Sequence, residues 1–88
     1  VLRVPLADGT LVPTADVPPD DLVASLLTTS DVLGTGWFAA DAANVKPGST
    51  VVVVGDGAVG LLGALSAKHM GAERIIMMSR HEKRQELA

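Results

Sequence analysis

Three glycines that directly follow an apolar run could bind a phosphate group. The run Val51–Val54 leads into Gly55-Asp56-Gly57-Ala58-Val59-Gly60, which has the spacing Gly-x-Gly-x-x-Gly. In this pattern the first glycine permits a tight turn, the second lets the backbone approach a pyrophosphate, and the third lets helix and strand pack closely. The following helix start adds free N–H groups and the positive end of its dipole. The predicted phosphate-binding residues are therefore Gly55, Gly57, Ala58 and Gly60.

A second group of polar residues lies where dinucleotide-binding folds select between NAD and NADP. These folds usually place Asp or Glu about 20 residues beyond the glycines, where it accepts a hydrogen bond from the ribose 2′-OH. Here Ser79 and Arg80 occupy that place, directly after the predicted strand at residues 74–78. Ser79 can donate to a 2′-phosphate, and Arg80 can bind it through charge-assisted hydrogen bonds, with Arg84 one helical turn further on. The sequence therefore predicts NADP(H) in preference to NAD(H).

Ser79 also has a structural interpretation. The residues Ser79-Arg80-His81-Glu82 match the S-x-x-E capping box, in which the serine side chain caps the start of a helix. An N-cap serine can still face a ligand, so the two interpretations are compatible.

The elements that would position these residues follow an α/β pattern. Val51–Val54 is apolar throughout, as expected of a parallel strand covered on both faces. We predict part of a Rossmann fold, that is, of a doubly wound parallel sheet, as a βαβ unit preceded by a short β segment and linking helices. Expected strands cover residues 51–54 and 74–78, and expected helices cover residues 20–27, 31–43, 58–70 and 81–88.

The first residues contain turn and linker signals. Val1–Pro5 and Leu11–Val12 flank Ala7-Asp8-Gly9-Thr10, in which the Asp-Gly pair favours a turn, so we expect a short hairpin or the end of a β-rich region. Residues 13–19 contain several prolines and are interpreted as a linker. The expected divisions are a β-rich end with its linker at residues 1–18, linking helices at 19–48, and a nucleotide-binding unit at 49–88.

Composition excludes several classes of protein. The net charge is −3 with no basic block, which argues against nucleic acid as the main partner. The absence of cysteine excludes disulfides and thiolate metal sites within these residues. The longest charge-free run, Gly57 to Ala67, is too short to span a bilayer, so we expect a cytoplasmic protein without membrane contact. A hydrophobic content of 48% in 88 residues suits an internal segment of a longer polypeptide, or a homo-oligomer.

A longer pattern surrounds the glycine motif. Asp31-x-x-x-Thr35-Gly36-Trp37 and Lys46-Pro47-Gly48 precede it, and Gly71-Ala72 and Ile75-Ile76 follow it. With these residues the chain from about Leu26 to Ala88 resembles the zinc-dependent alcohol dehydrogenases of the medium-chain dehydrogenase/reductase superfamily. Residues 1–13 more weakly resemble the last strands of that family's GroES-like catalytic domain.

The resemblance implies an enzyme that transfers hydride between NADP(H) and an alcohol or carbonyl substrate, with Zn²⁺ as a Lewis acid. It aligns Asp31 with a catalytic zinc ligand, and Thr35 and Val59 with residues that line the nicotinamide pocket. From the residues alone, Asp31 is more simply an ordinary carboxylate at a helix start, and only the resemblance makes the zinc interpretation its equal. The family's other zinc ligands and proton-relay residues align upstream of Val1, so these 88 residues alone are expected to be inactive.

Two other functions remain open from the sequence. One is a non-catalytic nucleotide-binding module. The other is a zinc-independent quinone or enoyl reductase of the same superfamily, which would purify without zinc. A methyltransferase with a similar glycine loop is disfavoured, because it would need an acidic residue near Ser79 for the ribose of its cofactor.

Overall fold

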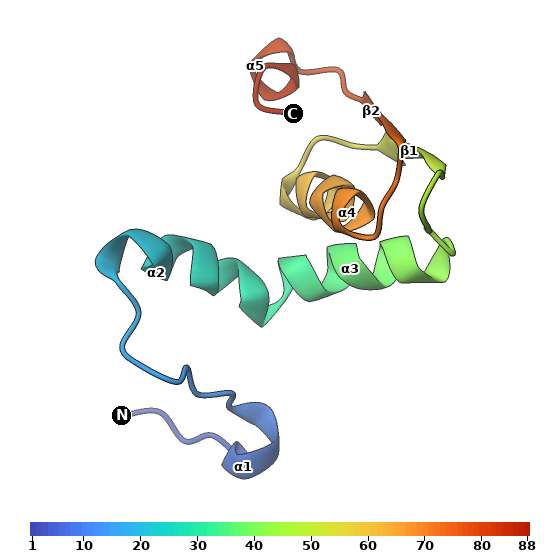
Figure 1. Ribbon diagram of the computed structural model, residues 1–88. Coiled ribbons are helices and arrows are strands. Elements are labelled where there is room, and N and C mark those ends of the chain that lie inside the picture. The colour runs from blue at the N-terminus through green and yellow to red at the C-terminus, as the bar shows by residue number, and fades with distance from the viewer.

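A strand–helix–strand unit forms the centre of the molecule. The computed structural model describes all 88 residues, and this unit consists of β1 (Thr50–Val54), α4 (Ala58–His69) and β2 (Arg74–Met78) (Figure 1). The two strands pair in parallel, with Val54 opposite Met78. A parallel pair needs a crossover connection, and α4 supplies it. The predicted parallel βαβ arrangement and both predicted strands are confirmed.

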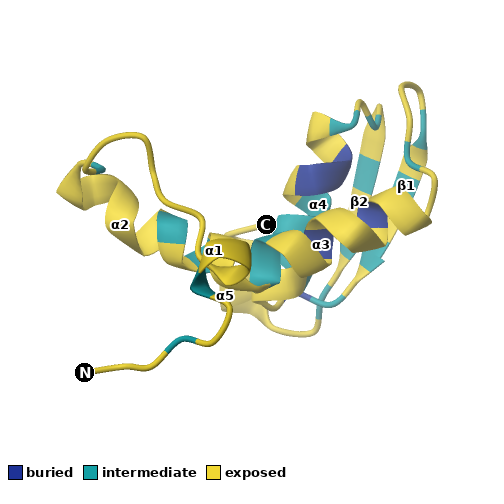
Figure 2. Ribbon diagram, turned by 90° about the horizontal axis from the view of Figure 1, so that it is seen from below, coloured by how far each residue is buried: buried dark blue, intermediate teal, exposed yellow.

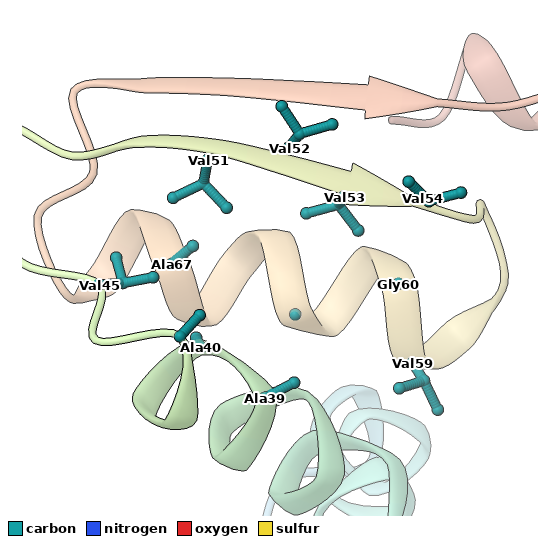
Figure 3. A pocket seen from close by; sticks show the side chains of 12 residues that line it. Ala39, Ala40, Val45, Val51, Val52, Val53, Val54, Val59, Gly60 and Ala67 are labelled. Atoms are coloured by element: carbon teal, nitrogen blue, oxygen red, sulfur yellow. The ribbon is translucent and has the colours of Figure 1, made fainter.

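One face of the two-stranded sheet packs on α4. Burial alternates along both strands, and Val51 and Val53 point towards α4 whereas Val52 points away (Figure 3). On the opposite face Val54 and Met78 are exposed, to 81% and 56% respectively. Parallel sheets are normally covered on both faces, so half of the surface that such a sheet usually buries is open here.

Helix α3 (Val32–Ala42) packs along α4 through glycine. A Cβ atom built on Gly36 would lie 2.7 Å from the backbone N of Gly63, so the two helix backbones are in direct contact. Further along the same interface, the Trp37 ring lies 5.5 Å from the ring of His69, at an angle of 51°. The small residues of α4 therefore serve contact with α3 as well as with the sheet.

Few residues are buried, and they lie mainly where α3, α4 and β1 meet. Only five of the 88 residues are buried, among them Ala40 and Ala67 (Figure 2). An apolar cavity of about 400 Å³ lies between α3, α4 and β1 (Figure 3). It has no charged residue in its lining.

The first thirty residues extend away from this centre. Helix α2 (Asp20–Leu27) has the predicted bounds, and a short 3₁₀ turn, η1 (Thr28–Ser30), connects it to α3. The expected β segment at the start of the chain is wrong, because residues 7–10 form a single helical turn, α1 (Ala7–Thr10). Thr10 closes that turn, since its N–H and its hydroxyl both donate to the Leu6 carbonyl, at 3.1 and 3.0 Å. No strand of the chain pairs with this segment, so a helical turn satisfies its backbone groups better than a hairpin.

The last helix is shorter than expected. Helix α5 covers only Glu82–Gln85, whereas the sequence predicted residues 81–88. Helix α4 ends one residue before its expected bound, and α3 lies one residue inside its expected bounds at each end. None of the helices has the length and apolar composition needed to cross a membrane.

Candidate cofactor site

The predicted glycine turn joins β1 to α4 at the carboxyl end of the sheet. Gly55 has φ +119°, which side-chain-bearing residues rarely adopt. Its N–H donates to the Met78 carbonyl at 3.0 Å, so the turn begins beside the end of β2. Residues that follow the two strands are therefore neighbours, although more than twenty positions separate them in the sequence.

The start of α4 leaves backbone donors free. Its N-cap residue is Gly57, and no side chain caps the helix. The N–H groups of Ala58, Val59 and Gly60 lie in the first turn, where a helix offers no internal acceptor. Unpaired N–H groups combined with the positive end of the helix dipole favour an anion at this position.

The shape of the turn also suits a bound group. A Cβ atom on Gly57 would meet no atom within 4 Å, so space is open in front of this residue. A Cβ atom on Gly60 would lie 2.3 Å from the Gly55 carbonyl oxygen, so Gly60 is required by the packing of helix against turn. Free donors beside open space fit a pyrophosphate, which is the group that the glycine spacing predicts.

A polar cluster ties the glycine turn to the residues after β2. The Asp56 carboxylate accepts hydrogen bonds from the Ser79 hydroxyl, from His81 Nδ1 at 3.0 Å and from Arg84 Nη1 at 3.4 Å. The Asp56 side chain is only 8% exposed, whereas those of His81 and Arg84 are 63% and 54% exposed. A nearly buried carboxylate is thus hydrogen-bonded by two partners that remain in contact with solvent.

These contacts keep Asp56 ionised. The hydrogen bond from Ser79 is the main cause that lowers the pKa of Asp56 from 3.8 to about 2, and the hydrogen bond and charge of His81 act in the same direction. Partial desolvation of the Asp56 carboxylate raises its pKa, but the hydrogen bonds lower it by more. Asp56 is therefore a carboxylate at neutral pH, and it can only accept hydrogen bonds.

The capping-box interpretation of Ser79 is wrong. Helix α5 begins at Glu82 with His81 as its N-cap, and no side chain caps it. The Ser79 hydroxyl instead donates to Asp56, while its oxygen accepts from the His81 N–H at 3.1 Å. Gln85 Nε2 donates to the Ser79 carbonyl at 3.0 Å, which holds α5 close to the end of β2.

Arg80 differs from its neighbours because it forms no ion pair. It lines an open groove of about 410 Å³ at the carboxyl ends of both strands. The residues that line this groove are Val54, Asp56, Met78, Ser79, Arg80 and His81. An unpaired guanidinium beside a groove can bind an anionic ligand there.

The other predicted site residues lie on α3 and at the start of α4. Asp31 is the N-cap residue of α3, and its carboxylate lies 3.2 Å from the Thr35 hydroxyl, with both residues exposed. No group of three or more His, Cys, Asp or Glu residues lies together, so Asp31 belongs to no such ligand cluster. Val59 lines the apolar cavity between α3, α4 and β1 and is 40% exposed.

The site contains two residues that the sequence reasoning did not include. No role is assigned to Asp56 or to His81 in the sequence analysis. A usable signal was present, because parallel neighbours end at the same edge of a sheet and a single acid after β1 must then face the bases after β2.

Comparison with known proteins identifies related sequences. No protein-family model matches the chain. The chain is 45% identical over 60 residues, or 68% of its length, to an NADP-dependent isopropanol dehydrogenase of Entamoeba histolytica. It is 44% identical over 62 residues, or 70% of its length, to a protein of the same name from Clostridium beijerinckii. It is 39% identical over 77 residues, or 85% of its length, to an uncharacterized zinc-type alcohol dehydrogenase-like protein of Bacillus subtilis.

The aligned region is a small part of each relative. It covers 15% and 18% of the two isopropanol dehydrogenases and 20% of the Bacillus protein. On these matches the chain belongs to the zinc-type alcohol dehydrogenase family and corresponds to one stretch of its longer members.

Proposed function

We propose that the chain is the NADP(H)-binding segment of a zinc-type alcohol dehydrogenase, in which β1, α4 and β2 are part of a Rossmann fold. Two relatives are named as NADP-dependent isopropanol dehydrogenases. The Bacillus relative is named as a zinc-type alcohol dehydrogenase-like protein. Under this proposal the whole protein oxidises an alcohol or reduces a carbonyl compound.

The observation that carries the proposal is the juxtaposition of two anion-binding features at one sheet edge. The uncapped start of α4 would bind the pyrophosphate through its N–H groups. The hydrogen bond from the Gly55 N–H to Met78 brings this turn beside Ser79 and Arg80, which would face the adenosine ribose. A 2′-phosphate there would meet the unpaired guanidinium of Arg80, and an Asp or Glu would repel it.

The remaining residues would act at the other end of the cofactor. Thr35 and Val59 would line the nicotinamide pocket, and Asp31 would supply one carboxylate ligand to zinc. The Thr35 hydroxyl near Asp31 Oδ1 would orient that carboxylate and leave its second oxygen free. The bound cofactor would supply hydride-transfer chemistry, and zinc would supply Lewis acidity towards the substrate oxygen.

Other parts of the longer protein would complete the structure. The remaining zinc ligands would come from outside these 88 residues, because Asp31 belongs to no cluster of three or more ligand-type residues. Additional strands and helices would cover the exposed sheet face at Val54 and Met78. Residues 19–48 would link the cofactor domain, which begins near residue 49, to a catalytic domain that ends near residue 18.

The test is a fluorescence titration of the purified full-length protein with NADPH and with NADH at matched salt. We expect NADPH to bind more tightly, and the double variant Ser79→Asp/Arg80→Ile to reverse the preference, because it replaces a cation with a carboxylate. Failure of both cofactors to bind would refute the nucleotide site. An unchanged preference in the variant would refute the assignment of Ser79 and Arg80.

Metal analysis tests the zinc part independently. We expect zinc to copurify with the full-length protein and Asp31→Ala to reduce its content, with Asp41→Ala, an exposed carboxylate on the same helix, as the matched control. A protein that purifies without zinc and still reduces a carbonyl compound would instead be a zinc-independent reductase of the superfamily.

A further inference from the structure

The glycine turn places a carboxylate at the end of β2, although the two residues directly after that strand are Ser79 and Arg80. Asp56 comes directly after Gly55, yet its carboxylate reaches Ser79, the first residue beyond β2. It also lines the groove beside Arg80. In dinucleotide-binding folds an acidic side chain at this edge accepts from the ribose hydroxyls of NAD. Here an acid from the neighbouring strand end occupies equivalent space.

This carboxylate can accept a further hydrogen bond. An ionised carboxylate offers about four lone-pair positions. Asp56 Oδ2 accepts from the Ser79 hydroxyl and from His81 Nδ1, whereas Oδ1 accepts one long contact, at 3.4 Å, from Arg84. Oδ1 therefore retains capacity for a hydroxyl donor in the groove.

The same contacts limit what Ser79 can do. A serine hydroxyl has a single proton, and Ser79 donates it to Asp56. A dianionic 2′-phosphate can only accept, so Asp56 competes with it for that proton and adds a like charge nearby. A ribose 2′-OH can donate to Asp56 and accept from Arg80. The arrangement therefore assists the cofactor without the 2′-phosphate and opposes the one that carries it.

We propose that Asp56 is a specificity-determining residue that binds the adenosine ribose of NAD(H) and competes with the 2′-phosphate of NADP(H) for the Ser79 hydroxyl. Arg80 and Asp56 then act in opposite directions on cofactor choice, and the protein accepts both cofactors with a modest preference for NADP(H). The inference rests on the proposed dinucleotide site and deepens it.

The first test measures dissociation constants for NADPH and NADH by titration calorimetry on the full-length protein, before and after Asp56→Asn. The amide keeps the shape of the side chain but removes its charge. We expect NADPH to bind several-fold more tightly and NADH several-fold more weakly, so that the ratio of the two constants changes by about tenfold. Asp41→Asn changes the net charge equally at an exposed position on α3, and it should leave the ratio unchanged.

A double-mutant cycle tests the competition itself. In the parent protein Ser79→Ala should change the NADPH dissociation constant by less than about twofold, because the hydroxyl proton is already donated to Asp56. In an Asp56→Ala background, which has no acceptor at this position, the same substitution should weaken NADPH binding by about fivefold or more, because Ser79 is then free to donate to the phosphate. Equal effects of Ser79→Ala in both backgrounds would overturn the competition.

The outcomes separate this inference from the proposed function. Binding of neither cofactor to the parent protein would refute the nucleotide site and the inference with it. Binding of NADPH with a ratio unchanged by Asp56→Asn would overturn the inference alone. Equal weakening of both cofactors would also overturn it, and would mean that Asp56 only holds α5 against the glycine turn.

Discussion

Glycine has different roles on two sides of α4. On one side, which we call the packing side, α4 contacts other backbone segments. A Cβ atom on Gly36 of α3 would lie 2.7 Å from the Gly63 N, and one on Gly60 would lie 2.3 Å from the Gly55 carbonyl oxygen. On the turn side, a Cβ atom on Gly57 would meet nothing within 4 Å. The packing side needs glycine because the protein itself fills the space. On the turn side the protein leaves the space open, as the proposed pyrophosphate site requires.

The forces that hold the two sides together also differ. The packing side consists of direct backbone contact between α3 and α4, with buried Ala40 and Ala67 beside it. The turn side depends on hydrogen bonds to Asp56 from partners that are largely exposed. Substitutions on the packing side should therefore affect stability, and those on the turn side should mainly affect ligand binding.

The largest effect is expected for Gly60→Ala. Its Cβ atom would collide with the Gly55 carbonyl oxygen, which cannot move without disturbing the end of β1. We expect the free energy of unfolding of the full-length protein to fall by about 3 kcal/mol or more, at the upper end of the cost of overpacking. Urea denaturation measures this loss, and a variant as stable as the parent would show that helix and turn are not in contact.

The pair Gly36→Ala and Gly34→Ala separates packing from helix propensity within α3. Gly36 faces the backbone of α4, whereas a Cβ atom on Gly34 would meet nothing within 4 Å. We expect Gly36→Ala to destabilise the protein by about 2 kcal/mol. Gly34→Ala should stabilise it by up to about 1 kcal/mol, because alanine is the better helix former. Equal effects in denaturation experiments would contradict the close contact between the helices.

Local patterns in the sequence were sufficient to predict the central unit. The continuous apolar run at Val51–Val54 and the Gly71 turn at the end of α4 predicted the two strands and the crossover helix, and the structure confirms them. The Asp8-Gly9 pair predicted a hairpin, but the structure has a helical turn there. A turn signal does not reveal whether the flanking residues have a strand to pair with. Pairing depends on distant partners, which a local pattern does not contain.

The sequence predicted several residues of the candidate site, but it did not predict the contacts between them. The residue types around Ser79 indicated an anion site, yet the hydrogen bond from Ser79 to Asp56 spans 23 positions. That contact depends on the parallel register, in which Val54 lies opposite Met78. The capping-box pattern was misleading for the same reason, since a tertiary partner took the serine hydroxyl that the pattern assigns to a helix.

Gly57→Ala tests the turn side directly. Gly57 has φ −81° and ψ −179°, values that alanine adopts without strain, and no atom obstructs its Cβ. We expect no loss in the free energy of unfolding, but about tenfold weaker binding of both NADPH and NADH, because the methyl group would occupy space needed by the pyrophosphate. Denaturation and titration on the same preparation measure both quantities. Unchanged cofactor binding would mean that Gly57 serves only the turn.

The smallest effect is expected in the acid stability of the Asp56 cluster. Folding lowers the pKa of Asp56 from 3.8 to about 2, so its stabilising contribution is complete above pH 3.8. The contribution is lost as the pH falls towards 2, because the folded state must then bind a proton that it disfavours. The difference in unfolding free energy between the parent and Asp56→Asn should therefore shrink over this pH range. Exposure of His81 and Arg84 keeps that difference small, since solvent screens both charges.

Denaturation series at several pH values on both proteins measure the difference. If it stayed constant down to pH 2, the ionised Asp56 would contribute nothing to holding α5, and the turn side would resemble the packing side in depending on shape alone.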